Sequence, residues 1–283
     1  PIYCDIRLDT LNIDETKIEV LVTERTKAII PIHYAGIPAE MDKINEVAKK
    51  YNIPVIEDAA QAVNSKYNGK YAGNLCELGI YSFHATKSYS SGEGGALTMN
   101  NDKYFDRAEF LWEKGTDRSL VVQGLKNKYS WVDYGSSFLP SDILSALLYA
   151  QFQNLDKMQT IRKKLHDAYI STFEPYKNSG LKMLFVPKNI ETNYHAFWLL
   201  FNDEQKKDKF LRLSLENNIS SYIGYIPLHS SPMGKKLGGD KFYLPITDHV
   251  GSSIVRLPFY LMTDEEIVYT CITLSNILKK VLI

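Results

Sequence analysis

Residues 28–60 contain two apolar β-like segments with an amphipathic segment between them, and this order restricts the fold more strongly than any other part of the sequence. The segment AIIPIHY (28–34) is continuous, apolar and rich in β-branched residues, which predicts a buried strand. MDKINEVAKKYN (41–52) carries apolar residues on one face, which predicts a helix, and IPVIEDAA (53–60) predicts a second strand. Strand, helix and strand in succession form a βαβ unit, so we expect two parallel strands joined by a right-handed connection.

Polar side chains follow several predicted strands at the point where each strand ends. Two further short strands are predicted at 79–84 and 96–99, and His33, Asp58 and the stretch from Ser82 to Lys87 all follow strand ends. Ligands of open α/β sheets bind beyond the carboxyl ends of the strands. We therefore expect three strands to deliver polar groups to one edge of the sheet.

Lys87 and Asp58 are the two residues with the clearest chemical meaning. Lys87 lies between a β-like run and the glycine-rich turn GEGG, where glycines allow a ligand to approach the backbone closely. A lysine amine can form a Schiff base with the aldehyde of pyridoxal phosphate, and a carboxylate can keep the pyridine nitrogen of that cofactor protonated. Either residue alone could be a surface lysine or a capping aspartate, but the pair at neighbouring strand ends predicts a pyridoxal phosphate site.

Other polar residues near these strand ends are candidates for contacts with the cofactor or the substrate. Gln61, one helical turn after Asp58, is predicted to bond the phenolic oxygen of the cofactor, and Ser82 and Ser88 could bond its phosphate. A P-loop is not indicated, because GxxxxGK[ST] is absent. Candidate substrate contacts, each of which could also have a purely structural role, are His33, Tyr34, Glu93 and His229.

Charge and cysteine content argue against several other classes of protein. Lys plus Arg and Asp plus Glu each number 33, which gives no support for a nucleic-acid or membrane partner. No apolar run approaches the roughly 18 residues of a membrane span. The three cysteines include no CxxC pair, which is typical of a reduced cytoplasmic protein. The six histidines show no HExxH or other close ligand pair, so no metal is expected.

The second half of the sequence predicts a long helix followed by a smaller α/β domain. The helical pattern runs from Ser141 to about Tyr169, with Ser141 or Asp142 as its cap. After Pro175 come a strand (HAFWLLF), a helix (KKDKFLRLSLENN) and a final helix (DEEIVYTCITLSNILKK). We therefore expect a large domain over residues 1–140, a connecting helix over 141–172 and a small C-terminal domain over 173–283.

Motifs along nearly the whole chain resemble the sugar aminotransferases of the DegT/DnrJ/EryC1/StrS family. These motifs are PIHYAG, EDAAQ, SFHATK with GEGGAL, EKGTDRS, YSWVDYGSSFLPSD, YIPLH and VRLPFY. The resemblance implies an α/β fold of the fold-type I pyridoxal phosphate enzymes, with a mixed, mostly parallel sheet flanked by helices. It also implies a homodimer with shared active sites. Full-length relatives have a segment before the position of Pro1, so we expect the N-terminal part of the large domain to be missing here.

The resemblance assigns roles to individual residues. Lys87 would be the Schiff-base lysine, Asp58 the partner of the pyridinium nitrogen, Gln61 the ligand of the phenolic oxygen and Ser82 a phosphate ligand. Most family members carry an asparagine where this chain has Ser137, which would reach the phosphate of the other subunit. For the carboxylate of the amino donor, Arg118 and Arg256 are the candidates.

With Ser137 at this position and the motifs EKGTDRS and YIPLH, the chain resembles one subgroup of the family. That subgroup moves an amino group from L-glutamate to C4 of dTDP-4-keto-6-deoxy-D-glucose, giving dTDP-4-amino-4,6-dideoxy-D-galactose for enterobacterial common antigen and related polysaccharides. Two alternatives stay open. The chain could act on another epimer or position of a nucleotide sugar, or it could be a non-catalytic fragment.

Overall fold

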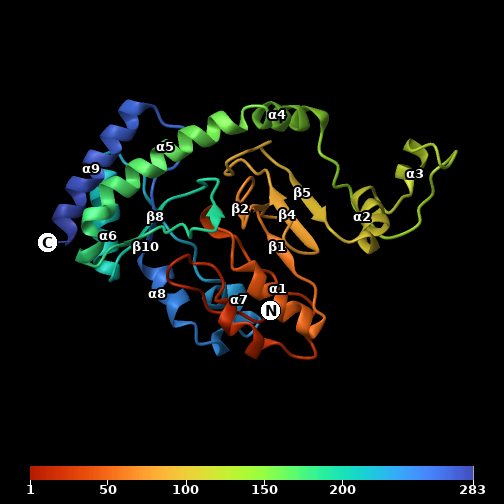
Figure 1. Ribbon diagram of the computed structural model, residues 1–283, viewed down its shortest axis with the longest axis horizontal. Helices are drawn as coiled ribbons and strands as arrows, with labels where there is room; N and C mark the ends of the chain where they lie inside the picture. Colours follow the sequence, from red (N-terminus) through yellow and green to blue (C-terminus); the bar gives the residue numbers. More distant parts are fainter. Residues whose placement is uncertain (283) are drawn as a thin grey trace.

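The computed structural model describes residues 1–282 of the 283-residue chain, which form two main sheets and a small third one (Figure 1). The first sheet has the order β1–β4–β5, with β1 (Ile56–Asp58) parallel to β4 (Leu78–Ser82) and β4 antiparallel to β5 (Gly95–Met99). This sheet is mixed, as the family resemblance implies. The helix α1 (Met41–Tyr51) confirms the predicted amphipathic segment and ends at Asn52, whose φ of 51° is left-handed.

The segment 28–34 lies parallel to β1, as the βαβ pattern predicts, but it forms only isolated bridges. The N–H of Ile29 donates to the carbonyl just before β1, and the N–H of His33 donates to the carbonyl of Asp58. In return, backbone N–H groups of β1 donate to the carbonyls of Ile29 and Pro31. The ladder is interrupted because Pro31 has no N–H to donate. The prediction that the segment is buried is wrong for one face: Ile30 and Ile32 are exposed, whereas Ile29 and His33 are buried.

The second sheet is antiparallel and lies in the C-terminal half. Its order is β6 (Lys182–Met183), β8 (Trp198–Leu200), β10 (Ile254–Arg256) and β9 (Tyr222–Ile223). Three helices lie beside it: α5 (Leu155–Phe173), α6 (Glu204–Glu216) and α9 (Asp264–Leu282), with α9 in contact with the other two (Figure 1). The buried face of α5 carries Leu165, Tyr169 and Phe173, which belong to the same hydrophobic core as Phe197.

Shorter elements complete the fold. The third sheet pairs β2 (Lys66–Tyr67) with β3 (Lys70–Tyr71) and β7 (Ile190–Glu191). Two short helices near the C-terminal sheet are α7 (Pro232–Lys236) and α8 (Pro245–Ser253). The 3-10 turns are Glu15–Lys17, Glu19–Leu21, Tyr34–Gly36, Asp102–Tyr104, Glu174–Ser179, Leu228–Ser230 and Gly239–Lys241. No helix within residues 1–282 has an apolar stretch long enough to cross a bilayer.

The single helix predicted over 141–169 is two helices, α4 (Asp142–Phe152) and α5, so this prediction is wrong at one point. Ser141 caps α4, because its hydroxyl accepts a hydrogen bond from the N–H of Leu144. Asn154 leaves the helical path with φ of −107° and ψ of 14°. Its side chain donates to the carbonyl of Ala150 at 2.9 Å, which satisfies an end of α4 and separates the two helices.

Residues between β5 and α4 form an arm that projects away from the sheet (Figure 1). The arm contains α2 (Phe105–Trp112) and α3 (Arg118–Val122), followed by irregular chain up to Pro140. Several of its aromatic side chains are exposed, namely Tyr129, Trp131, Tyr134 and Phe138. An isolated domain rarely exposes so many large apolar side chains in one region.

A buried carboxylate joins the first sheet to the chain on both sides of it. Glu57, in the middle of β1, accepts hydrogen bonds from the N–H groups of Gly73 (2.6 Å), Leu75 (2.5 Å) and Cys76 (2.9 Å). His33 Nε2 lies 3.0 Å from the same carboxylate, and His33 Nδ1 accepts from the N–H of Ala39. Burial alone would raise the pKa of Glu57, but the hydrogen bonds from His33 and the backbone outweigh it and lower that pKa below 4.5.

We predict that Glu57→Ala lowers the free energy of unfolding by about 3–5 kcal/mol, because several buried donors lose their acceptor. The control Glu191→Ala removes an exposed ion pair with Lys66 and should cost less than about 1 kcal/mol. Urea unfolding measures both. Because the folded pKa of Glu57 is lowered, its contribution is complete above pH 4.5 and is lost as the pH falls through the folded pKa. The gap between the wild type and Glu57→Ala should therefore narrow in acid, and a gap that widens there would contradict this role.

Candidate active site

The carboxyl ends of the parallel strands meet at one edge of the first sheet, where Asp58 and the Lys87 loop lie. Asp58 is in register with Ile80 of β4 on one side and with Ile32 on the other. The chain leaves β4 at Ser82 and turns through residues 83–91, which bring Lys87 to this edge. The side chain of Lys87 makes no hydrogen bond or ion pair within residues 1–282, so its amine is available for chemistry.

Asp58 and Gln61 present complementary groups beside that edge. One carboxylate oxygen of Asp58 accepts from the N–H of Ala60 at 3.0 Å, and no cation pairs with it in the described part of the chain. The side-chain oxygen of Gln61 accepts from the N–H of Ala35 at 2.8 Å. A backbone N–H can only donate, so this bond leaves the Gln61 NH₂ group as a donor for a ligand oxygen.

The loop after Lys87 is tied to a segment more than a hundred residues away in the sequence. Ser88 Oγ lies 2.8 Å from His195 Nδ1. Asn193 donates from its side chain to the carbonyls of Gln61 (3.0 Å) and Val63 (2.8 Å). The segment before β8 thus positions both the loop of Lys87 and the turn of Gln61.

His195 lies among positive charges. Desolvation, together with the charges of Arg162, Lys87 and Arg256, lowers the pKa of His195 to about 3. The ring is therefore neutral at physiological pH, and it holds Ser88 by a hydrogen bond between uncharged groups. Arg162, Lys87 and Arg256 thus all act as positive charges on this one ring.

Tyr34 lies at the same junction between the two sheets. Burial raises the pKa of Tyr34 to about 12, and the charge of Arg256 opposes part of that rise. The guanidinium of Arg256, at the end of β10, stacks over the ring of Tyr225 at 4.8 Å. The charge of Arg256, from the C-terminal sheet, thus acts on both Tyr34 and His195.

Several predicted contact residues do not lie in this region or are already engaged. His33 is 0% exposed and both of its ring nitrogens are bonded, so it cannot contact a substrate as predicted. His229 is also buried and its Nε2 lies 3.0 Å from Asp248. Arg118 is paired with Glu113 at 2.6 Å on the arm, and Glu93 is exposed, 3.7 Å from His84.

Two serines predicted to bind phosphate occupy different parts of the molecule. Ser82 is the last residue of β4, beside the edge, and its hydroxyl lies 3.4 Å from the N–H of His84. Ser137 lies on the exposed arm and is bridged to Glu113. No bridge, hydrogen bond or ion pair within residues 1–282 links Ser137 to Lys87.

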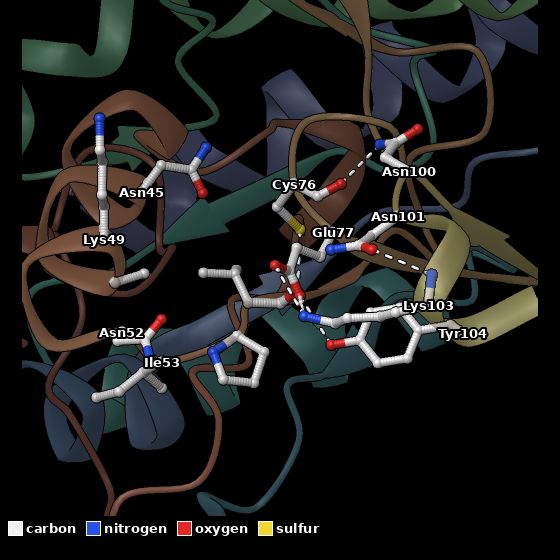
Figure 2. A pocket seen from close by; sticks show the side chains of 13 residues that line it. Asn45, Lys49, Asn52, Ile53, Cys76, Glu77, Asn100, Asn101, Lys103 and Tyr104 are labelled. Carbon is white, nitrogen blue, oxygen red and sulfur yellow. Dashed lines mark hydrogen bonds and ion pairs between the residues drawn. The ribbon is translucent and has the colours of Figure 1, made fainter.

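A cavity of about 650 Å³ lies at the opposite end of the sheet (Figure 2). It is lined by residues before β1 and β4 and after β5, so it faces the amino ends of the parallel strands. Several of its polar groups bond one another: Lys103 and Tyr104 both bond Glu77, and Asn100 bonds the Cys76 carbonyl (Figure 2). We therefore place the active site at the Lys87 edge rather than in this cavity. No cluster of metal-ligating side chains occurs within residues 1–282.

Three residues of the site were not among the sequence predictions: His195, Asn193 and Arg162. His195 and Asn193 belong to no local motif, and their partners are far away in the sequence. Arg162 could have been predicted from the sequence, because it occupies the same helical face of α5 as the buried residues Leu165, Tyr169 and Phe173. A charged residue at a core position of an amphipathic helix indicates a buried partner or ligand.

The sheet, its strand-end lysine and the comparisons together define an α/β aminotransferase. A solved structure of a putative sugar aminotransferase from Streptococcus pneumoniae in its PMP form superimposes with a TM-score of 0.88 at 25% identity, over 99% of this chain and 76% of the other. Among curated proteins, a spore coat polysaccharide biosynthesis protein of Bacillus subtilis is 30% identical over 94% of this chain and 70% of its own length. A GDP-perosamine synthase of Escherichia coli O157:H7 is 28% identical over 98% and 72%.

The model of the DegT/DnrJ/EryC1/StrS aminotransferase family matches residues 1–274. The chain belongs to this family, which confirms the predicted family, the fold class and the assignment as an enzyme. Pyridoxal phosphate is the cofactor of the family, so the cofactor prediction is confirmed at that level. The groups at the edge fit this cofactor: a free amine (Lys87), an unpaired carboxylate (Asp58) and an oriented amide donor (Gln61).

Proposed function

We propose that the chain transfers an amino group from L-glutamate to C4 of dTDP-4-keto-6-deoxy-D-glucose, giving dTDP-4-amino-4,6-dideoxy-D-galactose for a bacterial surface polysaccharide. The observation that carries the proposal is that Asp58 ends β1 and the loop of the unpaired Lys87 follows the parallel neighbour β4, so that both lie at one edge of the sheet. Membership of an aminotransferase family supports the reaction type. The motifs EKGTDRS and YIPLH, with Ser137, support the sugar, and a sugar aminotransferase of another position or epimer is the alternative.

The residues at the strand-end edge would have different roles in cofactor binding and proton transfer. Lys87, Asp58, Gln61 and Ser82 would hold pyridoxal phosphate, which supplies an electron-accepting ring when bound. Lys87 Nζ would move the proton that leaves the α-carbon of the donor, and such transfer by a placed side chain is typically worth about 10²- to 10⁴-fold in rate. Asp58 would hold its negative charge opposite the ring nitrogen, since no cation of the described chain neutralises it.

We predict that Lys87→Ala lowers turnover by at least about 10²-fold, because the proton-transfer group is lost. Release of 2-oxoglutarate from L-glutamate, with the keto sugar as acceptor, measures the rate. Lys66→Ala is the matched control, since Lys66 pairs with Glu191 on β2, and it should keep wild-type activity. Retention of a tenth of the rate in Lys87→Ala would contradict the role of Lys87. The configuration at C4 of the product, determined by NMR, decides between the proposed sugar and its epimer.

We also propose that the active unit is a homodimer in which the arm of one copy covers the edge of the other. The exposed apolar side chains of the arm and of α4 support this arrangement, as does the distance in the fold between Ser137 and Lys87. The phosphate of the cofactor would then be bound by Ser82 of one copy and Ser137 of the other. Within one copy, residues 1–140 would form the large domain and residues 173–283 the small one, joined through α4 and α5.

We predict that Ile143→Asp converts the dimer into a monomer, because it places a charge on an apolar contact surface. Ile143 is 82% exposed near the start of α4, where an acidic residue is compatible with the helix dipole. Val20→Asp is the matched control, since Val20 is 83% exposed on a different surface. Light scattering after size exclusion measures the mass. A monomeric wild type, or equal dissociation of both variants, would refute the proposed interface.

A further inference from the structure

The loop that carries Lys87 is closed at its base by hydrogen bonds of its own backbone. The N–H of Ser91 donates to the carbonyl of Phe83 at 2.9 Å, and the N–H of Ala85 donates to the carbonyl of Gly92 at 2.8 Å. Beyond Lys87, residues 88–90 form no backbone–backbone hydrogen bond within residues 1–282. This part of the loop therefore depends on side chains to satisfy its backbone groups and to fix its position.

Gln151, in the last turn of α4, supplies both missing partners of Ser90. Its side-chain oxygen accepts from the N–H of Ser90 at 3.0 Å, and its NH₂ group donates to the carbonyl of the same residue. A backbone N–H can only donate and a carbonyl can only accept, so these partners determine which end of the amide faces which group. The side chain thus pairs with Ser90 as a residue of a neighbouring antiparallel strand would.

Ser90 connects this amide to the base of the loop. Its hydroxyl accepts from the N–H of Gly92 at 2.9 Å, at the start of the glycine-rich turn, and donates to the carbonyl of Phe83 at 3.3 Å. Both groups belong to the residues that close the loop. By holding the backbone of Ser90, Gln151 therefore also restrains the two ends of the loop.

An aromatic contact from the same helical turn acts beside the amide. Phe152, the residue after Gln151, packs against the rings of Phe83 and Tyr89, with ring centroids 5.7 and 6.0 Å away. Phe83 and Tyr89 are both buried, and they lie on the two sides of Lys87 in the sequence. The end of α4 therefore contacts the chain both before and after the lysine.

We propose that Gln151 is a positioning residue for Lys87, which holds the amine at the strand-end edge by fixing Ser90 against α4. This inference rests on the proposed function, because it assumes that Lys87 carries the chemistry. The side chain of Lys87 makes no hydrogen bond or ion pair of its own within the described chain, so the backbone of the loop determines where its amine lies. A displacement of about 1 Å at a reacting group can lower a rate by about 10²-fold.

Gln151→Met and Gln151→Glu test the amide pair with little change in side-chain volume. Met removes both hydrogen bonds, whereas Glu keeps an acceptor for the N–H of Ser90 and places a second oxygen against the carbonyl of Ser90. Gln153→Met is the matched control, because Gln153 is exposed and its side chain makes no hydrogen bond within residues 1–282. Urea unfolding of each variant identifies conditions under which all the proteins are folded.

The main measurement is the rate at which borohydride traps added pyridoxal phosphate on Lys87 of the full chain, followed by peptide mapping. We expect both Gln151 variants to lower this rate by about tenfold or more, and Gln153→Met to leave it unchanged. The kcat should fall in the Gln151 variants while the KM for the keto sugar changes little, because Gln151 acts through the loop and not on the sugar. Without cofactor, hydrogen exchange of residues 84–91 should be faster in the Gln151 variants alone.

The outcomes distinguish positioning from a purely structural role and from a failure of the proposed function. A purely structural role would lower the urea midpoint of the Gln151 variants but leave the rate of trapping in the folded protein unchanged. Trapping on Lys87 at the wild-type rate in both variants would therefore overturn the inference and leave the proposed function standing. Absence of trapping on wild-type Lys87 would overturn the proposed function and the inference with it.

Discussion

The buried carboxylate of Glu57 is the interaction on which the geometry of the site depends. It binds three backbone N–H groups of the loop before β4 and the ring of His33, so it fixes the chain on both sides of β1. Neighbouring residues of a strand point to opposite faces. Because Glu57 is held in the interior, Asp58 must project to the other face, beside the loop of Lys87. The polar network therefore sets the direction of the functional carboxylate without contacting a ligand itself.

The site combines residues at the ends of paired strands with residues on loops and on segments that connect the two halves of the chain. Asp58 and Ser82 lie at the ends of paired strands, whereas Lys87 lies on a loop that Ser88 ties to His195. Asn193 and His195 belong to the segment that leads into the C-terminal sheet, and Arg162 comes from the helix that connects the two halves. The loop of Lys87 and the turn of Gln61 thus depend on contacts from elements that lie far apart in the sequence.

Sequence patterns predicted the parts of the fold and site that depend on local order. The parallel arrangement of residues 28–34 and β1, the helix α1 and the position of Asp58 follow from a single βαβ unit, and the position of Lys87 follows from the further strand predicted at 79–84. The exposure of Ile30 and Ile32 did not follow, because apolar composition does not tell which face of a strand is covered. The break between α4 and α5 depends on one side chain, Asn154, that competes for a backbone carbonyl. His195 was missed because only a tertiary contact brings it to Ser88, and Arg162 was missed although a charged residue on the buried face of α5 could have indicated it. The roles of Ser82 and Ser137 stay predictions.

The central claim is that the amine of Lys87 is the group that binds the aldehyde of pyridoxal phosphate at the strand-end edge. Reduction of the purified protein with borohydride after addition of the cofactor, followed by peptide mapping by mass spectrometry, tests it directly. The account predicts one labelled peptide, with the label on Lys87 and with loss of the visible absorption band on reduction. A label on another lysine, or a visible band that reduction does not trap on Lys87, would contradict it.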